Sequence, residues 1–127
     1  MPTAVKILIM LFRLVWLIGL ALGIWIWTGH GYSMLRMHIG LGFCTVLLLA
    51  LVAVLGAVAR AGVGRVFLAI LWVVLLPIAG FGQLSPMAGA QHWVFRVVHL
   101  VIGVAAIGSA EMLAAKAVRR GRGRELA

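Results

Sequence analysis

The chain has 127 residues, of which 65% are hydrophobic and only 10% are charged, and its mean hydropathy is +1.23. A soluble domain of this size is about half apolar and about a quarter charged. The composition therefore excludes an ordinary soluble domain and indicates an integral membrane protein. The net charge of +9 does not indicate nucleic-acid binding, because the basic residues cluster at the ends of apolar runs and form no stripe on a soluble face.

Four apolar runs follow one another along the chain, at residues 7–27, 35–59, 66–84 and 94–115. Each is close to the ~20 residues that a membrane-spanning helix requires, and each is too continuous for a barrel strand. The connections are short, which favours antiparallel neighbours. We therefore expect an all-α fold, an up-down-up-down four-helix membrane bundle formed as one domain by residues 1–118, with a basic cytoplasmic tail at 119–127.

The first run is preceded by Lys6 and lacks the small-residue cleavage pattern of a signal peptide, so it is expected to stay as a transmembrane helix. Within it, Gly19 and Gly23 share one helix face and favour close helix packing. In the second run, Cys44 is the only cysteine of the chain. It excludes an intrachain disulfide and covalent haem attachment, and we expect it to be a small core residue.

The second and fourth runs each open with the pattern Arg, His and then Gly four residues after the His. The first copy is Arg36, His38 and Gly42; the second is Arg96, His99 and Gly103. Residues i and i+4 share a helix face, so a flat ligand held by the His would pass over a residue without a side chain. This pattern predicts that His38 and His99 are the axial ligands of one non-covalent b-type haem iron, bound between two helices of the bundle.

The remaining histidines, His30 and His92, lie closer to the predicted loops. We expect them to be interfacial, in positions where they could line a quinone or partner site. Two alternatives stay open: a transition-metal site built from all four histidines, since imidazole binds Zn and Cu, and a His/Met haem site that uses Met34 or Met37.

Three further charged residues lie in or beside the predicted spans. Arg36 and Arg96 precede the key histidines, where they would pair with haem propionates or reach lipid phosphates. Glu111 is the only acidic residue within a span, and we expect it to pair with Arg13 or Lys116.

The lysines and arginines also predict the orientation, because cytoplasmic loops are enriched in them. One side holds Lys6, Arg13, Arg60, Arg65, Lys116, Arg119, Arg120, Arg122 and Arg124, whereas the other holds Arg36 and Arg96. Both termini are therefore expected to be cytoplasmic, in a bacterial-type inner membrane, with all four histidines toward the outer side. The two hairpins share their His and Gly spacing, which suggests a parallel repeat about an axis along the membrane normal.

On these residues the chain resembles the four-helix b-type cytochromes of bacterial membranes, broadly the cytochrome b561-like group. The resemblance is carried by the Trp-rich first helix that ends in Thr28-Gly29, by His38 with Gly42, and by His99 with Gly103. Typical di-haem members carry ligands at both ends of the bundle, whereas here every His is at one end. The resemblance implies at most one haem, near the outer face, with His38 and His99 as ligands, in an electron-transfer subunit or oxidoreductase that connects quinol in the bilayer with an outer-side partner.

A different class of function is also compatible with the sequence. The small size and the lack of nucleotide-binding or hydrolase motifs favour a cofactor-free structural or assembly subunit of a larger membrane complex. With only two carboxylates, a paired-carboxylate hydrolase is excluded. The partners that these hypotheses imply are the lipid bilayer, a quinone, a redox protein, or a second copy of the chain.

Overall fold

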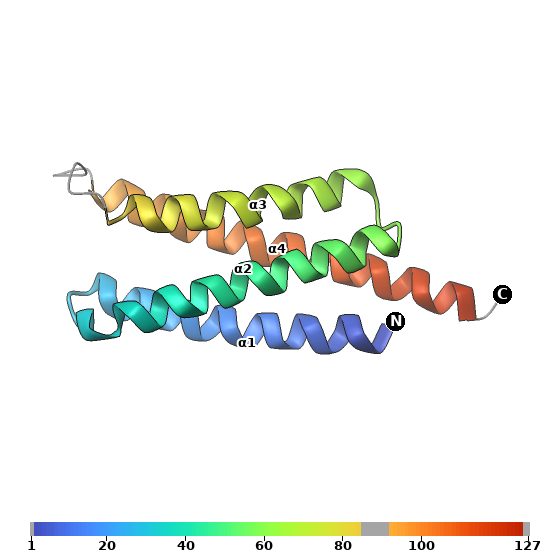
Figure 1. The fold of residues 1–127 in the computed structure, drawn as a ribbon, viewed down its shortest axis with the longest axis horizontal. Coiled ribbons are helices and arrows are strands. Elements are labelled where there is room, and N and C mark those ends of the chain that lie inside the picture. The colour runs from blue at the N-terminus through green and yellow to red at the C-terminus, as the bar shows by residue number, and fades with distance from the viewer. Residues whose placement is uncertain (1, 85–91, 126–127) are drawn as a thin grey trace.

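The computed structural model describes residues 2–84 and 92–125. Within them the chain forms four α-helices, α1 (Pro2–Trp27), α2 (Leu35–Val58), α3 (Val63–Gly82) and α4 (His92–Glu125), with a 3-10 turn, η1 (Tyr32–Met34), between the first two. Successive helices run in opposite directions along the long axis (Figure 1). The prediction of an all-α four-helix bundle is confirmed.

Each helix is long and apolar enough to cross a membrane, over Thr3–Trp27, Tyr32–Val58, Val63–Gly82 and His92–Arg120. The chain is thus a multi-pass membrane protein. Helices α1, α3 and α4 begin before the apolar runs from which they were predicted, and α4 also ends after its run. The difference arises because a helix continues through polar residues such as Lys6 and Arg119 as long as its backbone hydrogen bonds persist, whereas an apolar run stops there.

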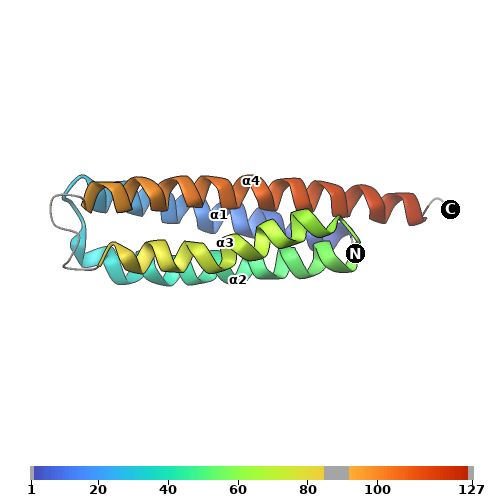
Figure 2. The ribbon, with the colours of Figure 1, turned by 90° about the horizontal axis from the view of Figure 1, so that it is seen from above.

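The helices pack as two antiparallel hairpins, α1 with α2 and α3 with α4. Helix α2 also packs against α3, α1 against α4, and α2 against α4 across the diagonal of the bundle. Two views at right angles show how the helices are arranged (Figures 1 and 2). Because α2 and α4 meet along the centre, the helices that carry His38 and His99 are brought face to face.

The two ends of the bundle differ in their packing. We call the end that holds the α2–α3 turn the basic end and the opposite end, near the α1–α2 turn, the histidine end. The buried core lies in the half nearer the basic end and consists largely of small residues: Val5, Ile9, Phe12, Leu49, Val52, Ala53, Ala59, Ala61, Ala69, Ala106, Ala110, Leu113, Ala114 and Ala117. Small side chains let membrane helices approach closely, so this half is tightly closed.

Gly56 marks a close approach of α2 and α4 in this core. A Cβ atom built on Gly56 would lie 2.6 Å from Cγ of Leu113. Nearby, the indole nitrogen of Trp72 donates a 2.8 Å hydrogen bond to the hydroxyl of Ser109, which in turn donates to the Ala105 carbonyl. The polar groups of this interior are thus paired between α3 and α4.

Helix α4 continues beyond the other helices at the basic end (Figure 1). It is helical through Glu125, so the segment from residue 119, predicted as a tail outside the bundle, is a helical extension as far as the structure describes it. Arg120 of this extension donates a hydrogen bond to the carbonyl of Arg60 in the α2–α3 turn. Arg60 has a positive φ of 52° and Gly62 a φ of 114°, which lets the turn reverse within a few residues.

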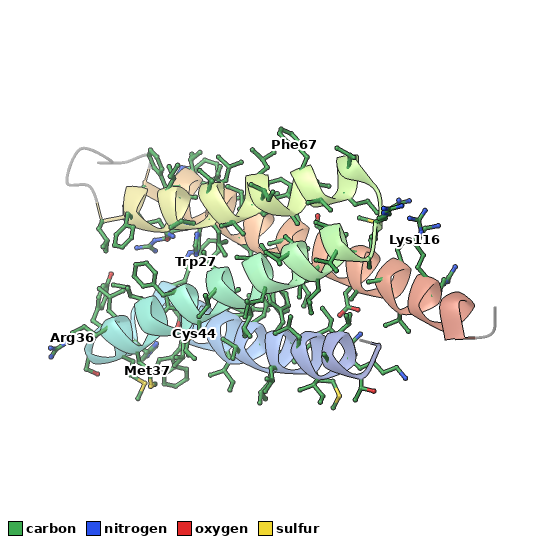
Figure 3. The ribbon with its side chains drawn as sticks, turned by 45° about the vertical axis from the view of Figure 1, so that its right-hand side comes forward. Trp27, Arg36, Met37, Cys44, Phe67 and Lys116 are labelled. Atoms are coloured by element: carbon green, nitrogen blue, oxygen red, sulfur yellow. The ribbon has the colours of Figure 1, made fainter. Side chains whose placement is uncertain are left out.

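Cys44 is exposed on α2, and Figure 3 labels it with Met37 on the same helix. The prediction that Cys44 is a core residue is wrong. In a bilayer the outward face of a helix is as apolar as its inward face, so an apolar neighbourhood in the sequence does not separate core positions from lipid-facing ones.

Candidate functional site

A cavity of about 320 Å³ occupies the histidine end of the bundle, beyond the alanine-rich core. All four helices and η1 contribute to it. Its lining is mainly apolar, as is typical of cofactor and small-molecule sites. The apolar residues that line it include Trp16, Leu20, Ile24, Trp27, Leu35, Ile39, Phe43, Val46, Leu76, Phe81 and Leu100.

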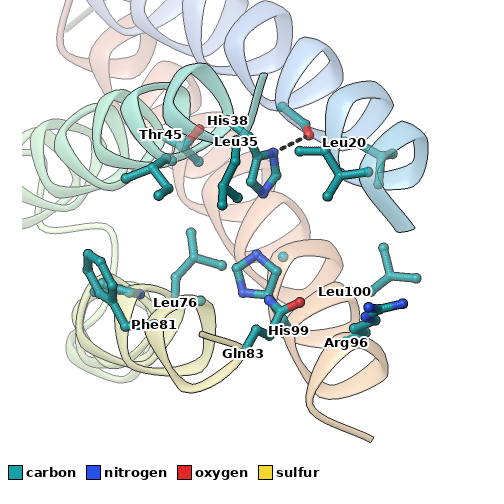
Figure 4. A pocket seen from close by; sticks show the side chains of 18 of the residues that line it. Leu20, Leu35, His38, Thr45, Leu76, Phe81, Gln83, Arg96, His99 and Leu100 are labelled. Atoms are coloured by element: carbon teal, nitrogen blue, oxygen red, sulfur yellow. Dashed lines mark hydrogen bonds between the residues drawn. The ribbon is translucent and has the colours of Figure 1, made fainter. Parts of the chain in front are cut away.

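His38 of α2 and His99 of α4 both line this cavity, and their rings face each other across it (Figure 4). The ring centroids lie 6.3 Å apart and the ring planes are inclined at 71°. The structure thus brings together the two histidines that the sequence paired, although they are 61 positions apart in the chain.

The orientation of His38 is fixed by helix α1. Nδ1 of His38 lies 3.0 Å from the carbonyl oxygen of Gly19, which can only accept, so the ring donates its Nδ1 proton there. In the neutral imidazole the other nitrogen, Nε2, then carries the free lone pair. This is the arrangement in which a metal-binding His is usually held, with its second ring nitrogen bonded to a carbonyl.

The ring of His99 lies against helix α3, beside Gly80, but within the described part of the chain no hydrogen bond fixes it there. Its Nδ1 atom is buried and has no hydrogen-bond partner among the described residues. The site therefore contains a buried polar atom whose hydrogen-bonding capacity is unused, which is uncommon in a protein interior.

Two glycines make room for the two rings. A Cβ atom on Gly23 would lie 3.0 Å from Cε1 of His38, and a Cβ atom on Gly80 would lie 3.3 Å from Cε1 of His99. Each hairpin thus sets a residue without a side chain against the ring of its His, which is compatible with the repeat predicted from the sequence.

The predicted glycines Gly42 and Gly103 both line the cavity, but they differ in what covers them. Open space lies over Gly42, where a Cβ atom would meet no other atom within 4 Å. Trp16 lies over Gly103, with its Nε1 atom 3.8 Å from the corresponding position, and donates a 3.0 Å hydrogen bond to the Gly103 carbonyl. Trp16 therefore bounds the cavity beside His99, whereas the surface beside His38 is open.

The two arginines that precede His38 and His99 differ in their position relative to the cavity. Arg96 lines the cavity and is half-buried. Arg36 is exposed and is absent from the cavity lining; Figure 3 shows it at the end of the bundle, directed away from it. Of the two, only Arg96 is placed to pair with an anionic group inside the cavity.

The remaining histidines occupy unequal places. His92 lines the cavity, but its Nε2 donates to the carbonyl of Gln83 over 2.5 Å, which ties the start of α4 to the end of α3. His30 is exposed, 5.5 Å from the ring of Trp25, with Nδ1 3.3 Å from the Thr28 hydroxyl. Among the described residues no three His, Cys, Asp or Glu side chains gather as a metal site.

Two other predictions about side chains are decided by the structure. Met34 and Met37 are exposed and do not line the cavity, so neither takes part with His38 or His99 there. Glu111 pairs with Arg13, one of the two partners expected for it, through bonds of 2.5 Å and 2.6 Å. This pair lies outside the cavity.

The separation of the two rings is the one expected of two imidazoles that share one metal ion. A nitrogen ligand lies about 2 Å from a bound transition metal, so two rings on opposite sides of one ion have centres about 6 Å apart. The observed 6.3 Å meets this requirement. The free lone pair of His38 and the bare surface at Gly42 are also compatible with a planar group held between the rings.

Comparison of the chain with protein-family models, with curated proteins and with solved structures finds no match. The class of protein that the fold and the site define is a small multi-pass helical membrane protein with a histidine-lined cavity at one end of its bundle.

Sequence reasoning missed several residues that shape this cavity. Gly19 and Gly23 were interpreted as helix-packing residues, but they hold and accommodate the ring of His38. Gly80 and Trp16 were not singled out. Their relation to the histidines becomes apparent only when α1 and α3 are set beside α2 and α4, although the four-residue spacing of Gly19 and Gly23 was a usable signal.

Proposed function

We propose that this chain is a membrane b-type cytochrome, similar to the cytochrome b561-like group, that holds one haem b between His38 and His99. The observation that carries the proposal is the pair of imidazoles that face each other over an apolar cavity, with ring centroids 6.3 Å apart. Haem supplies one-electron chemistry, and the protein supplies ligation, burial and electrostatics.

The residues of the cavity would divide these tasks. Gly19 orients His38 through the Nδ1 hydrogen bond and strengthens the basicity of Nε2. Gly23 and Gly80 allow both rings to reach the centre of the bundle. Arg96 offers a cation to the carboxylates of the macrocycle, and its planar guanidinium suits such groups. The apolar walls would exclude water and, together with His38 and His99, would set the reduction potential of the haem.

The proposed task is to transfer electrons between quinol in the bilayer and a partner on the outer side. The distribution of lysine and arginine supports an orientation with both termini in the cytoplasm, which directs the histidine end outward. Exposed apolar residues such as Ile24 and Phe43 at the cavity give a quinone access from lipid. His92 and Tyr32 lie at the same cavity, toward the turns, where a ligand from the outer side would arrive.

A visible spectrum of the detergent-purified protein tests the proposal directly. After expression with ample haem, the protein should show a Soret band that shifts on reduction with dithionite, together with sharp α and β bands of a six-coordinate b haem. His38→Ala and His99→Ala should each abolish this spectrum.

His30→Ala is the matched control, because His30 is exposed and lies outside the cavity, and it should leave the spectrum unchanged. A colourless wild-type protein that is correctly inserted would overturn the cytochrome proposal. It would favour a cofactor-free subunit of a larger membrane complex, which co-purification from native membranes would then identify.

A further inference from the structure

The ion pair between Arg13 and Glu111 lies on the outside of the bundle, where α1 and α4 run side by side. Nε and Nη2 of Arg13 donate to the two carboxylate oxygens of Glu111. The arginine side chain is 52% exposed and the glutamate side chain 36% exposed. These two bonds use two of the five donors of the guanidinium, and Arg13 makes no other hydrogen bond within the described residues.

This pair lies within the membrane-spanning segments Thr3–Trp27 and His92–Arg120. Arg13 is seven residues from Lys6, and Glu111 is five residues from Lys116. With a rise of 1.5 Å per residue, both charges lie about 8–10 Å inward from these lysines of the basic end, inside a hydrocarbon core that is about 30 Å thick.

A half-exposed ion pair at that depth is unfavourable in a lone bundle. Ionisable residues inside membranes almost always face other protein or water, because hydrocarbon cannot satisfy their remaining hydrogen-bonding groups. The cavity cannot provide that environment, since neither Arg13 nor Glu111 lines it. Some polar surface from outside the chain is therefore expected to cover the pair.

We infer that a second copy of this chain covers it, in a two-fold dimer whose axis runs along the membrane normal. The two copies must share one orientation in the membrane, and rotation about that axis places α1 of one copy opposite α4 of the other. Because Arg13 and Glu111 lie at nearly the same depth, each arginine then faces the glutamate of the partner. The pair is self-complementary, as a two-fold interface requires.

The surface around the pair allows such an approach. We define the α1–α4 face as Arg13 and Leu17 on α1 with Gly108, Glu111 and Ala115 on α4. On α4 these residues follow a spacing of three and four, so they share one side of the helix, and Gly108 and Ala115 are exposed. No atom lies within 4 Å of a Cβ position on Gly108. Small residues on both sides of Glu111 let a neighbouring helix come close.

A charge-exchange experiment separates contacts between chains from the contact within each chain. The Arg13→Glu chain carries two carboxylates on the face, and the Glu111→Arg chain carries two guanidinium groups. In native mass spectrometry in mild detergent, the wild type should be a dimer, and each variant alone should be a monomer. Co-expressed with different affinity tags, the two variants should form a mixed dimer, because opposite charges then meet only across the interface.

Two outcomes would overturn the inference: a monomeric wild type, or variants that accumulate in the membrane yet never co-purify with each other. A complex of one copy with a different polypeptide would overturn it as well.

Cysteine cross-linking tests the same interface without disturbing the ion pair. In a Cys44→Ser background, Leu17→Cys and Gly108→Cys lie at similar depths, and the two-fold arrangement sets one against the other across the interface. Membranes that contain both differently tagged chains should give a covalent mixed dimer on oxidation. Leu47→Cys, which is 62% exposed on α2, is the matched control and should stay monomeric.

The α1–α4 interface would be rejected if Leu17→Cys and Gly108→Cys gave no cross-link, or if they gave no more cross-linking than the Leu47→Cys control. This test remains valid even if the charge variants fail to accumulate. The inference does not depend on the proposed haem, so its success or failure is independent of the spectrum described above.

Discussion

Gly23 of α1 and His38 of α2 lie in direct contact, with room between them for no side chain: a Cβ atom on Gly23 would lie 3.0 Å from Cε1 of the imidazole. The same helix supplies the Gly19 carbonyl that holds Nδ1 of that ring. One face of α1 thus sets both the position and the rotation of His38.

Gly23→Ala should therefore move His38 by a few tenths of an ångström and weaken the proposed haem site. We expect a broadened or shifted α band and a lower haem content per protein. Gly40→Ala is the control, because it adds the same methyl group to a transmembrane helix at a position with open space around it. Equal spectra for the two variants would show that the contact does not constrain the site.

Removal of the charge of Arg96 should lower the midpoint potential of the proposed haem. Reduction adds an electron, so a nearby cation stabilises the reduced form, and its loss favours the oxidised form. Arg96→Gln should shift the potential downward by tens of millivolts in a redox titration. Arg36→Gln, which changes an exposed arginine outside the cavity lining, should leave it unchanged; a larger shift there would contradict the placement of the two arginines.

Ser109→Ala should destabilise the basic half of the bundle without affecting the cavity. The substitution leaves the Trp72 indole N–H without its 2.8 Å acceptor. Side-chain hydrogen bonds between membrane helices contribute about 0.5–2 kcal/mol, so we expect a loss of that size in the free energy of unfolding, measured by titration with a denaturing detergent. Ser33→Ala, at an exposed position in η1, serves as the comparison and should change little.

Gly56→Ala should destabilise the fold through overpacking. Its methyl group would collide with Leu113, whose Cγ lies 2.6 Å from the Cβ position, and inserted methyl groups in tight cores cost about 1–3 kcal/mol. Gly64→Ala, with open space around it, should be neutral or slightly stabilising. If the collision is the cause, Leu113→Ala combined with Gly56→Ala should cost less than the sum of the two single changes, because the two sites are in contact.

The sequence was sufficient for the number of helices, their order and the pairing of His38 with His99 in space. Apolar runs of about 20 residues identify spanning helices directly, and short connections determine which helices are neighbours. The helix ends were less accurate: α4 begins at His92 and continues through Glu125, well past the apolar run that predicted it.

The direction in which each side chain faces was much harder to predict. Cys44 was expected in the core and is exposed, because core and lipid are equally apolar. Arg36 lies two residues before His38, whereas Arg96 lies three residues before His99, so only Arg96 shares a helix face with its His and lines the cavity. For Cys44 the direction depends on the rotation of α2 about its axis, which packing against neighbours decides and which a single sequence with weak apolar periodicity does not encode visibly.

The alanine-filled basic half of the bundle and the hollow histidine half should respond differently to a ligand. The alanine-filled half contains side chains from all four helices, so it can pack without a ligand in the cavity. The proposed haem would therefore meet helices whose other ends are already packed together, and its loss would relax only the histidine end of the bundle.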